Sequence, residues 1–180
     1  MKTFLLKEKT MNKEIKVDYL FLDNQKCTRC ISTENILDEA FTELQKVLDK
    51  AGHRFVLNKE QITSREKAIE YRFVSSPTIR VNGKDIAFSL TENSCEDCGD
   101  LCGCGEETQC RTWEFDGKTY EVPPLSLVLD RMLSTIYSTE KSYENSSYKL
   151  SENLEKYFEG ISANLVNQKE EPCCSSDCCS

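Results

Sequence analysis

The residues with the clearest chemical potential in this sequence are its eleven cysteines, which fall into three groups. Two form the C-x-x-C pair Cys27 and Cys30, five lie between residues 95 and 110, and four lie between residues 173 and 179. Cysteine thiolates attack disulfides and bind soft metal ions. In a reducing compartment, clustered cysteines more often carry one of these two chemistries than form permanent bridges. The grouping therefore predicts a function based on thiol chemistry.

The C-x-x-C pair can close a small disulfide with little change of the backbone. Cys27 would attack a substrate disulfide, and Cys30 would then resolve the mixed disulfide. Arg29 places a cation nearby, which would favour the Cys27 thiolate. A metal-binding loop or two inert thiols are the alternatives. Because Ser32 and Thr33 are natural helix caps, we expect the following helix to begin after Cys30.

The middle group places five thiols, with glycines between them, in a short acidic segment that could wrap a small ion. Four thiolates suffice for tetrahedral zinc, whereas the spacing matches neither common ferredoxin pattern. Redox-active thiols and local disulfides are the alternatives. The candidate metal ligands are Cys95, Cys98, Cys102, Cys104 and Cys110.

The last group consists of two adjacent pairs, Cys173-Cys174 and Cys178-Cys179. They offer soft ligands for zinc or Cu(I), and by the same logic for trivalent arsenic or mercury. Adjacent cysteines form poor disulfides, so we do not expect a bridge within each pair. This segment could pass a metal to the middle group, act as a mobile dithiol for Cys27, or be a non-functional extension.

Several apolar segments with clear periodicity must position these thiols. Residues 15–22 read as a buried strand that ends just before the C-x-x-C pair. The Asn82-Gly83 and Asp116-Gly117 dipeptides predict two hairpins. In chain order we expect a strand at 15–22, a helix ending at Gly52, a strand at 53–57, a short helix after Thr63, strands at 78–81 and 85–90, a loop at 91–110, strands at 112–115 and 119–122, and a helix after Pro124.

The order of these elements is typical of a thioredoxin-like redox domain, in which C-x-x-C follows the first strand of a βαβ unit. Pro77, just before a strand that enters a hairpin, is then expected to have a cis peptide bond, to face the C-x-x-C pair and to position a substrate disulfide. Because the Asn82-Gly83 turn sends the chain back, the insert at 91–110 should emerge beside Cys27 and Pro77. We therefore expect the insert to cover the pair and to share thiol chemistry or a metal with it.

Three motifs give the sequence a resemblance to a known group. They are Tyr19-Leu20-Phe21-Leu22-Asp23 before the C-x-x-C pair, Phe73-Val74-Ser75-Ser76-Pro77-Thr78-Ile79-Arg80, and Cys95-Glu96-Asp97-Cys98-Gly99-Asp100-Leu101-Cys102. With them the chain resembles an uncharacterised family of thioredoxin-like domains of bacteria and archaea, over roughly residues 15–137. The resemblance implies the fold and suggests thiol chemistry, but it supplies no substrate. Residues from Leu150 onward lie outside it.

We therefore predict an α/β chain with a thioredoxin-like mixed sheet flanked by helices, a Cys-rich insert and an extra C-terminal helix. The expected organisation is a loose leader (1–14), the thioredoxin-like domain (15–137, with the insert at 91–110), a linker (138–149), an amphipathic helix (150–166) and a disordered Cys-rich tail (167–180). Docking of the amphipathic helix on the domain is favoured over a partner contact.

Charge and apolar content exclude several classes of function. With a net charge of -8 and no basic stripe, nucleic acid is not an expected partner. No apolar run approaches the roughly 18 residues of a membrane span, and the N-terminal residues lack the features of a signal peptide. We therefore expect a cytoplasmic protein. The single histidine, His53, excludes a zinc finger with two histidines.

Two functions from different classes remain, and whether the protein is an enzyme stays open. The first is a thioredoxin-like thiol–disulfide oxidoreductase that uses Cys27, Cys30 and Pro77 on a protein or small-molecule disulfide. The second is a protein that binds or transfers a soft metal or metalloid such as zinc, copper, arsenic or mercury. A thioredoxin scaffold with a structural zinc and no catalysis is a third reading. Zinc or another thiophilic metal is thus the candidate cofactor.

Overall fold

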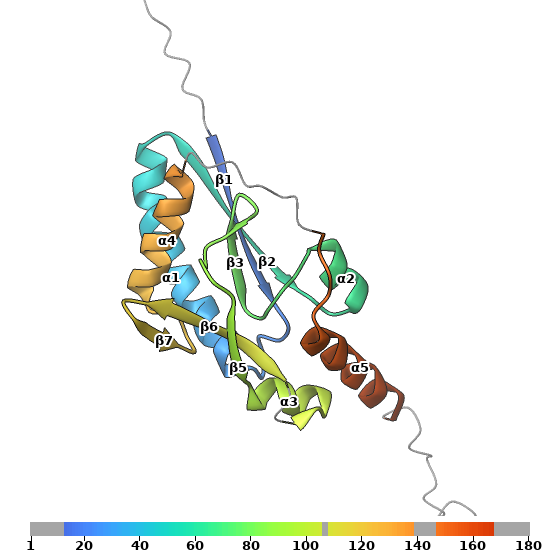
Figure 1. Ribbon diagram of the computed structural model, residues 1–180. Coiled ribbons are helices and arrows are strands. Elements are labelled where there is room, and N and C mark those ends of the chain that lie inside the picture. The colour runs from blue at the N-terminus through green and yellow to red at the C-terminus, as the bar shows by residue number, and fades with distance from the viewer. Residues whose placement is uncertain (1–12, 106–107, 139–146, 168–180) are drawn as a thin grey trace, which may run out of the picture.

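The computed structural model describes residues 13–105, 108–138 and 147–167, which form a mixed α/β protein (Figure 1). Two sheets have the strand orders β2-β1-β3-β4 and β5-β6-β7. The elements are β1 (Lys13–Phe21), α1 (Thr28–Lys50), β2 (His53–Gln61), α2 (Arg65–Glu70), β3 (Thr78–Val81), β4 (Lys84–Asp85), β5 (Thr91–Ser94), α3 (Glu96–Cys102), β6 (Gln109–Phe115), β7 (Lys118–Tyr120), α4 (Leu125–Tyr137) and α5 (Glu152–Asn167). The predicted α/β class is confirmed, whereas most of the predicted leader and linker and the tail after residue 167 lie outside the described residues.

Strand β1 is the centre of the larger sheet. It pairs in parallel with β2 along its whole length, from Lys13 opposite His53 to Phe21 opposite Gln61, and antiparallel with β3. Its residues from Tyr19 to Phe21 are all buried, as the nearly continuous apolar run indicated. The strand ends directly before the loop that carries Cys27, so the core of the sheet fixes where that loop starts.

Helices α1 and α4 lie side by side, and α2 and α5 lie on the other side of the sheet in this view (Figure 1). Helices α1 and α4 each bury one apolar face in the core. The residues of these faces are Leu37, Ala40, Leu44 and Leu48 of α1, and Leu127, Val128, Met132 and Ile136 of α4. No helix in the described part of the chain is long and apolar enough to cross a membrane.

The start of α1 differs from the prediction, because the helix begins at Thr28 and Cys27 is its N-cap residue. The expectation of a helix beginning after Cys30 was therefore wrong. The Thr28 N–H donates to Asp97 Oδ2 at 2.6 Å, so a carboxylate of the insert caps the helix. A partner this distant in sequence gives no local signal, while Ser32 and Thr33 lie inside the helix.

The insert also differs from the prediction, since residues 91–110 are not a loop but contain β5, α3 and the first residues of β6. The predicted strand at 85–90 shrinks to β4. Asp85 explains this change, because its carboxylate accepts hydrogen bonds from Ala87 N and from the Arg111 guanidinium. These contacts turn the chain away from β3 and toward the second sheet, where β5 pairs with β6.

Helix α5 docks on the domain, as favoured from the sequence. The Asn153 side chain bonds to both the N–H and the carbonyl of Gln109, at 2.9 and 2.8 Å, and Asn164 Nδ2 donates to Leu101 O at 3.2 Å. Its apolar residues Leu154, Tyr157 and Phe158 are buried. Helix α5 therefore packs against α3 and the start of β6.

Gly160 of α5 provides a test of this docking. A Cβ at this position would lie 2.3 Å from Cys102 O and 2.8 Å from Cys104 Sγ. Helix propensity alone would make Gly160→Ala stabilising by about 1 kcal/mol. We expect the clash to dominate and the variant to lose about 1–3 kcal/mol in the free energy of unfolding, measured by urea denaturation. Ser162→Ala, on the exposed face of the same helix, is the matched control and should change stability by less than about 0.5 kcal/mol. A stabilised Gly160→Ala protein would show that α5 does not dock here.

Candidate metal centre

Four buried thiols from distant parts of the chain meet at one point, and we refer to them as the four-cysteine cluster. Its members are Cys27, Cys95, Cys98 and Cys110. All four Sγ atoms lie within 4.8 Å of one another. The Sγ atoms of Cys27 and Cys95 are 4.0 Å apart, and those of Cys98 and Cys110 are 3.3 Å apart. Four sulfurs around zinc, each at 2.3 Å from the ion, lie about 3.8 Å apart, so the dimensions of the cluster fit a tetrahedral thiolate site.

The cluster is built from two parts of the fold. Cys95 is the N-cap of α3, Cys98 lies in the first turn of that helix, and Cys110 lies in β6. Backbone hydrogen bonds from Cys95 N to Thr108 O and from Gly99 N to Cys95 O hold the start of α3 against the residues before β6. Cys27 approaches from the end of β1, in the other sheet. An ion bound here would join the two sheets.

The loop before Cys27 and the residue after the cap hold the fourth thiol in place. Asp23 Oδ1 accepts hydrogen bonds from the backbone N–H groups of Gln25, Lys26 and Cys27. The insert then reaches over to cap α1 through Asp97. The predicted position of the insert beside the C-x-x-C pair is thus confirmed by the 4.0 Å between the Cys27 and Cys95 sulfurs.

Arg29, predicted to favour the Cys27 thiolate, has a different set of contacts. Its nearly buried guanidinium bonds to the side chain of Asn93, to Ser94 O at 2.8 Å and to Glu121 Oε1 at 2.6 Å. Arg29 therefore ties α1 to β5 and to the segment after β7. This is a second contact, besides that of Asp97, between the start of α1 and the insert.

The four thiols of the cluster differ in the direction in which their pKa values are shifted. The pKa of Cys27 is lowered, first by its contact with the Cys110 thiol and then by contacts with Cys30, Cys95 and Cys98. The pKa of Cys95 is also lowered, mainly by Cys110. The pKa of Cys98 is raised, first by its contact with Cys110 and then by contacts with Cys27 and Cys95. The pKa of Cys110 is raised, first by its contact with Cys27 and then by its contact with Cys95. A divalent cation would replace the thiol protons and stabilise all four thiolates.

Cys30 lies beside the four-cysteine cluster and is not a member of it. Its sulfur is 3.3 Å from Ser76 Oγ, and Ser76 precedes Pro77, whose peptide bond is cis as predicted. Ser76 Oγ also accepts from Leu22 N at 3.1 Å, which joins the Pro77 loop to the end of β1. The pKa of Cys30 is raised, first by its contact with Cys27 and then by burial. The C-x-x-C pair is thus divided between two environments.

The remaining two cysteines of the insert, Cys102 and Cys104, form a disulfide at the end of α3, with their Cα atoms 5.2 Å apart. Sequence reasoning treated all five insert cysteines as candidate ligands. The structure brings Cys95, Cys98 and Cys110 to the cluster and separates the other two from it. The candidate ligands Cys173, Cys174, Cys178 and Cys179 lie outside the described residues.

Sequence reasoning did not assign a role to three residues that position the site. Asp97 caps α1, Asp23 organises the loop before Cys27, and Ser76 contacts Cys30. For Ser76 a signal was present, because it directly precedes the proline predicted to be cis. For Asp97 the signal was weak, since an acid between two cysteines also suits a solvated surface.

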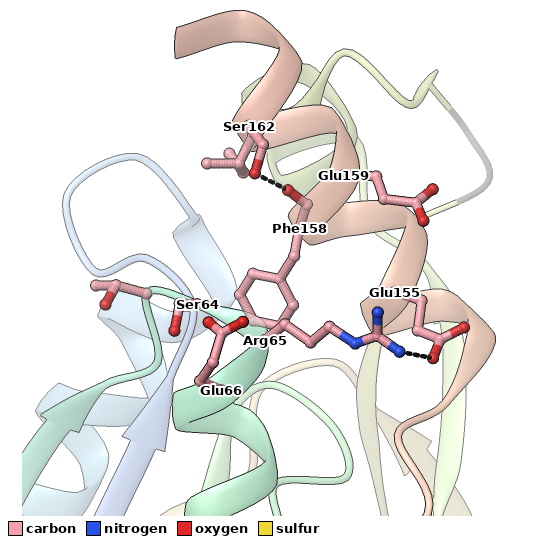
Figure 2. Close-up of a pocket in the computed structure, with 9 residues that line it drawn as sticks. Ser64, Arg65, Glu66, Glu155, Phe158, Glu159 and Ser162 are labelled. Atoms are coloured by element: carbon pink, nitrogen blue, oxygen red, sulfur yellow. Dashed lines mark hydrogen bonds and ion pairs between the residues drawn. The ribbon is translucent and has the colours of Figure 1, made fainter. Parts of the chain in front are cut away.

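A cleft of about 400 Å³ lies elsewhere, between the start of α2 and helix α5 (Figure 2). Phe158 lies across this cleft, and Arg65 reaches Glu155 in an ion pair of 2.9 Å. Its lining is a mixture of charged, hydroxyl and apolar side chains without a cysteine. The cleft is therefore separate from the thiol chemistry.

The fold and the site define a mixed α/β protein with a buried four-cysteine cluster. The chain matches the family described as "Domain of unknown function (DUF2703)" over residues 14–132, and it belongs to this family. The matched segment contains all four cluster cysteines together with Cys30, Cys102 and Cys104. It ends before α5 and before the four C-terminal cysteines. No curated protein and no solved structure matches the chain.

The cap from the insert to α1 can be tested by Asp97→Ala. Loss of a helix-capping carboxylate should lower the free energy of unfolding by about 1 kcal/mol, measured by urea denaturation. Glu96→Ala is the matched control, because Glu96 is an exposed acid in the same first turn of α3 that does not cap α1. Equal losses in both variants would show that the effect comes from α3 alone.

Proposed function

We propose that this protein binds a zinc ion in the four-cysteine cluster, as a closed tetrathiolate centre. The observation that carries the proposal is the meeting of four buried sulfurs within 4.8 Å of one another, from three separate segments of the chain. Sets of four thiolates at this spacing are typical of structural zinc sites. Without an ion, any thiolate among these four buried groups would have only neighbouring thiols to stabilise its charge.

Burial of the ligands favours a held ion over an ion in rapid exchange. Cys27, Cys98 and Cys110 have no exposed surface, and Cys95 is 2 % exposed. With four protein ligands, zinc has no open coordination position for a catalytic water. The role that fits is structural, because the ion would join the β1–α1 junction to the insert, and metal binding would add to the stability of the fold.

The scaffold that we infer for this centre is thioredoxin-like. The parallel β1–β2 pair, the antiparallel β3 and the cis Pro77 beside Cys30 all support this inference. In such a scaffold the insert would cover the C-x-x-C pair, and one of the two thiols would serve as a metal ligand.

Thiol–disulfide exchange at Cys27 and Cys30 is the second candidate function. Its support is that Cys27 is the N-cap residue of α1, and a helix N-terminus favours a thiolate, and that Cys30 lies next to Ser76 and Pro77. However, Cys27 and Cys30 both have 0 % exposure. A nucleophile for an external disulfide needs access, and for this reason the metal centre is preferred.

Metal content separates the two functions. In a parent protein with the four C-terminal cysteines changed to serine, we expect about one zinc per chain, measured by mass spectrometry of the native protein. Cys98→Ser should weaken zinc binding by at least about 100-fold, because it removes a direct ligand. Cys30→Ser is the matched control and should keep the zinc, since Cys30 lies outside the cluster.

A parent protein without zinc, or a Cys30→Ser variant that loses zinc as Cys98→Ser does, would contradict the metal centre. The same proteins can be assayed for insulin reduction with dithiothreitol. Reduction by the parent that disappears in Cys30→Ser would support the second candidate instead.

The pKa directions in the cluster give a further prediction about protons. Since Cys27 and Cys95 have lowered pKa values, zinc should displace protons mainly from Cys98 and Cys110. We therefore expect release of fewer than four protons per zinc at neutral pH, and weaker binding as the pH falls and the thiolates become protonated. Calorimetry in buffers with different ionisation enthalpies measures this number. Release of four protons would show that all four thiols are protonated in the metal-free protein.

A further inference from the structure

The Cys102–Cys104 disulfide is the thiol group of the insert that the metal centre does not use. It closes the end of α3 and lies against α5, where Gly160 leaves room for it. The two cysteines differ in exposure, since Cys102 is 2 % exposed whereas Cys104 is partly exposed. This difference favours Cys104 over Cys102 as the target of an attacking thiolate.

The surroundings of the buried sulfur suit a leaving group. Thr108 Oγ1 lies 3.2 Å from Cys102 Sγ and is itself buried. A hydroxyl at this distance can donate a hydrogen bond to the thiolate that forms on Cys102 when the S–S bond breaks. Departure of a stabilised thiolate is what speeds thiol–disulfide exchange.

The same surroundings also suit the reduced state. Gly99 O lies 3.5 Å from Cys102 Sγ, and Lys156 O lies 3.6 Å from Cys104 Sγ. After reduction, each new S–H group has a carbonyl oxygen within reach. Each sulfur of the disulfide thus already lies near an oxygen that could accept a hydrogen bond from the thiol formed on reduction.

We propose that Cys102 and Cys104 form a reversible dithiol–disulfide exchange site that takes a small dithiol or its disulfide as substrate. The substrate thiolate attacks Cys104 Sγ, the S–S bond breaks, and the electron pair leaves on Cys102, which takes up a proton. The second thiol of the substrate then attacks the substrate sulfur of this mixed disulfide. The substrate disulfide forms, and Cys104 leaves as a thiolate that takes up the proton of the second thiol. Two electrons and two protons pass from the dithiol to the protein, and the reverse reaction restores the disulfide.

The charge of the insert restricts the substrate. Glu96, Asp97 and Asp100 belong to α3, and no basic residue lies in that helix. An anionic thiol would be repelled as it approaches, whereas a neutral one would not. We therefore expect neutral thiols to react faster than anionic ones, and this difference should shrink as salt screens the charges.

The first experiment counts thiols in the full-length protein with the four C-terminal cysteines changed to serine. After aerobic purification, alkylation and mass spectrometry should find five free thiols and one disulfide, mapped to Cys102 and Cys104. Stepwise addition of dithiothreitol should reduce this disulfide, and oxidised dithiothreitol should restore it. Absence of the disulfide, or a disulfide that resists reduction in the folded protein, would overturn the proposal.

A matched pair of variants tests which sulfur is attacked. In Cys102→Ser, the remaining Cys104 thiol should form a mixed disulfide with 2-hydroxyethyl disulfide at least about tenfold faster than Cys102 does in Cys104→Ser. Mass spectrometry of the adduct at each position gives the two rates. Equal rates, or a faster Cys102, would contradict the assigned order of attack.

Thr108 is a positioning residue in this scheme, and its variants test the leaving group. Thr108→Val should slow reduction of the disulfide by mercaptoethanol by about tenfold, and Thr108→Ser should restore the rate. The free energy of unfolding, measured by urea denaturation, serves as the folding control and should stay close to that of the parent protein in Thr108→Ser. An unchanged rate in Thr108→Val would remove the hydroxyl from the mechanism.

Replacing mercaptoethanol by the anionic thiol mercaptoethanesulfonate tests the effect of substrate charge on the rate of reduction. An equal or faster rate for the anion would contradict the preference for neutral thiols.

This exchange site does not depend on zinc in the four-cysteine cluster, so the two proposals fail separately. A protein that lacks zinc can still exchange the Cys102–Cys104 disulfide. Conversely, a Cys102→Ser, Cys104→Ser double variant should keep its zinc while losing the exchange reaction.

If the C-terminal cysteines are retained, a third result becomes available. A disulfide between Cys104 and one of the four C-terminal cysteines would identify that segment as an internal substrate. Reduction with the same rate and products in the presence and absence of these cysteines would instead support an external dithiol.

Discussion

The contact between the start of α1 and the insert is the constraint on which the rest of the structure depends. Asp97 of α3 caps the first N–H of α1, and Arg29 of α1 reaches back to β5. Cys27 lies between these two contacts, at the point where the four-stranded sheet meets the smaller one. The position of this one thiol therefore depends on two elements that fold together only when the whole domain does.

The environment at this junction explains why five buried thiols can be tolerated. A buried polar group needs a partner, and an isolated buried thiolate is costly because burial removes its hydration. The four sulfurs of the cluster are one another's partners, and Cys30 has the hydroxyl of Ser76. A cation would remove the remaining cost, since it would neutralise the negative charge that four thiolates bring together.

The cysteines therefore do not form a single group with one chemistry. Within the described residues they separate into a buried cluster, one neighbouring thiol and one disulfide. The cluster and the disulfide share helix α3, which holds Cys98 in its first turn and Cys102 at its end. One short helix thus separates a set of buried thiols suited to an ion from a pair of which one member, Cys104, is partly exposed.

Much of this arrangement could be predicted from the sequence, and the rest could not for a physical reason. The apolar run at β1, the helical stripe of α1 and the Asn82-Gly83 turn are local patterns, so they determined the α/β order of elements. The place of Pro77 in that order predicted its cis peptide bond. The turn predicted that the insert meets Cys27, although the strand expected at 85–90 is only β4. Which sulfurs meet was decided by the tertiary structure alone. Sequence spacing favoured a bond between Cys27 and Cys30, yet the cap from Asp97 and the turn at Asp85 bring Cys95, Cys98 and Cys110 to Cys27 and leave Cys30 beside Ser76. Distances between side chains on different elements depend on packing, and the spacing of cysteines along the chain does not contain them.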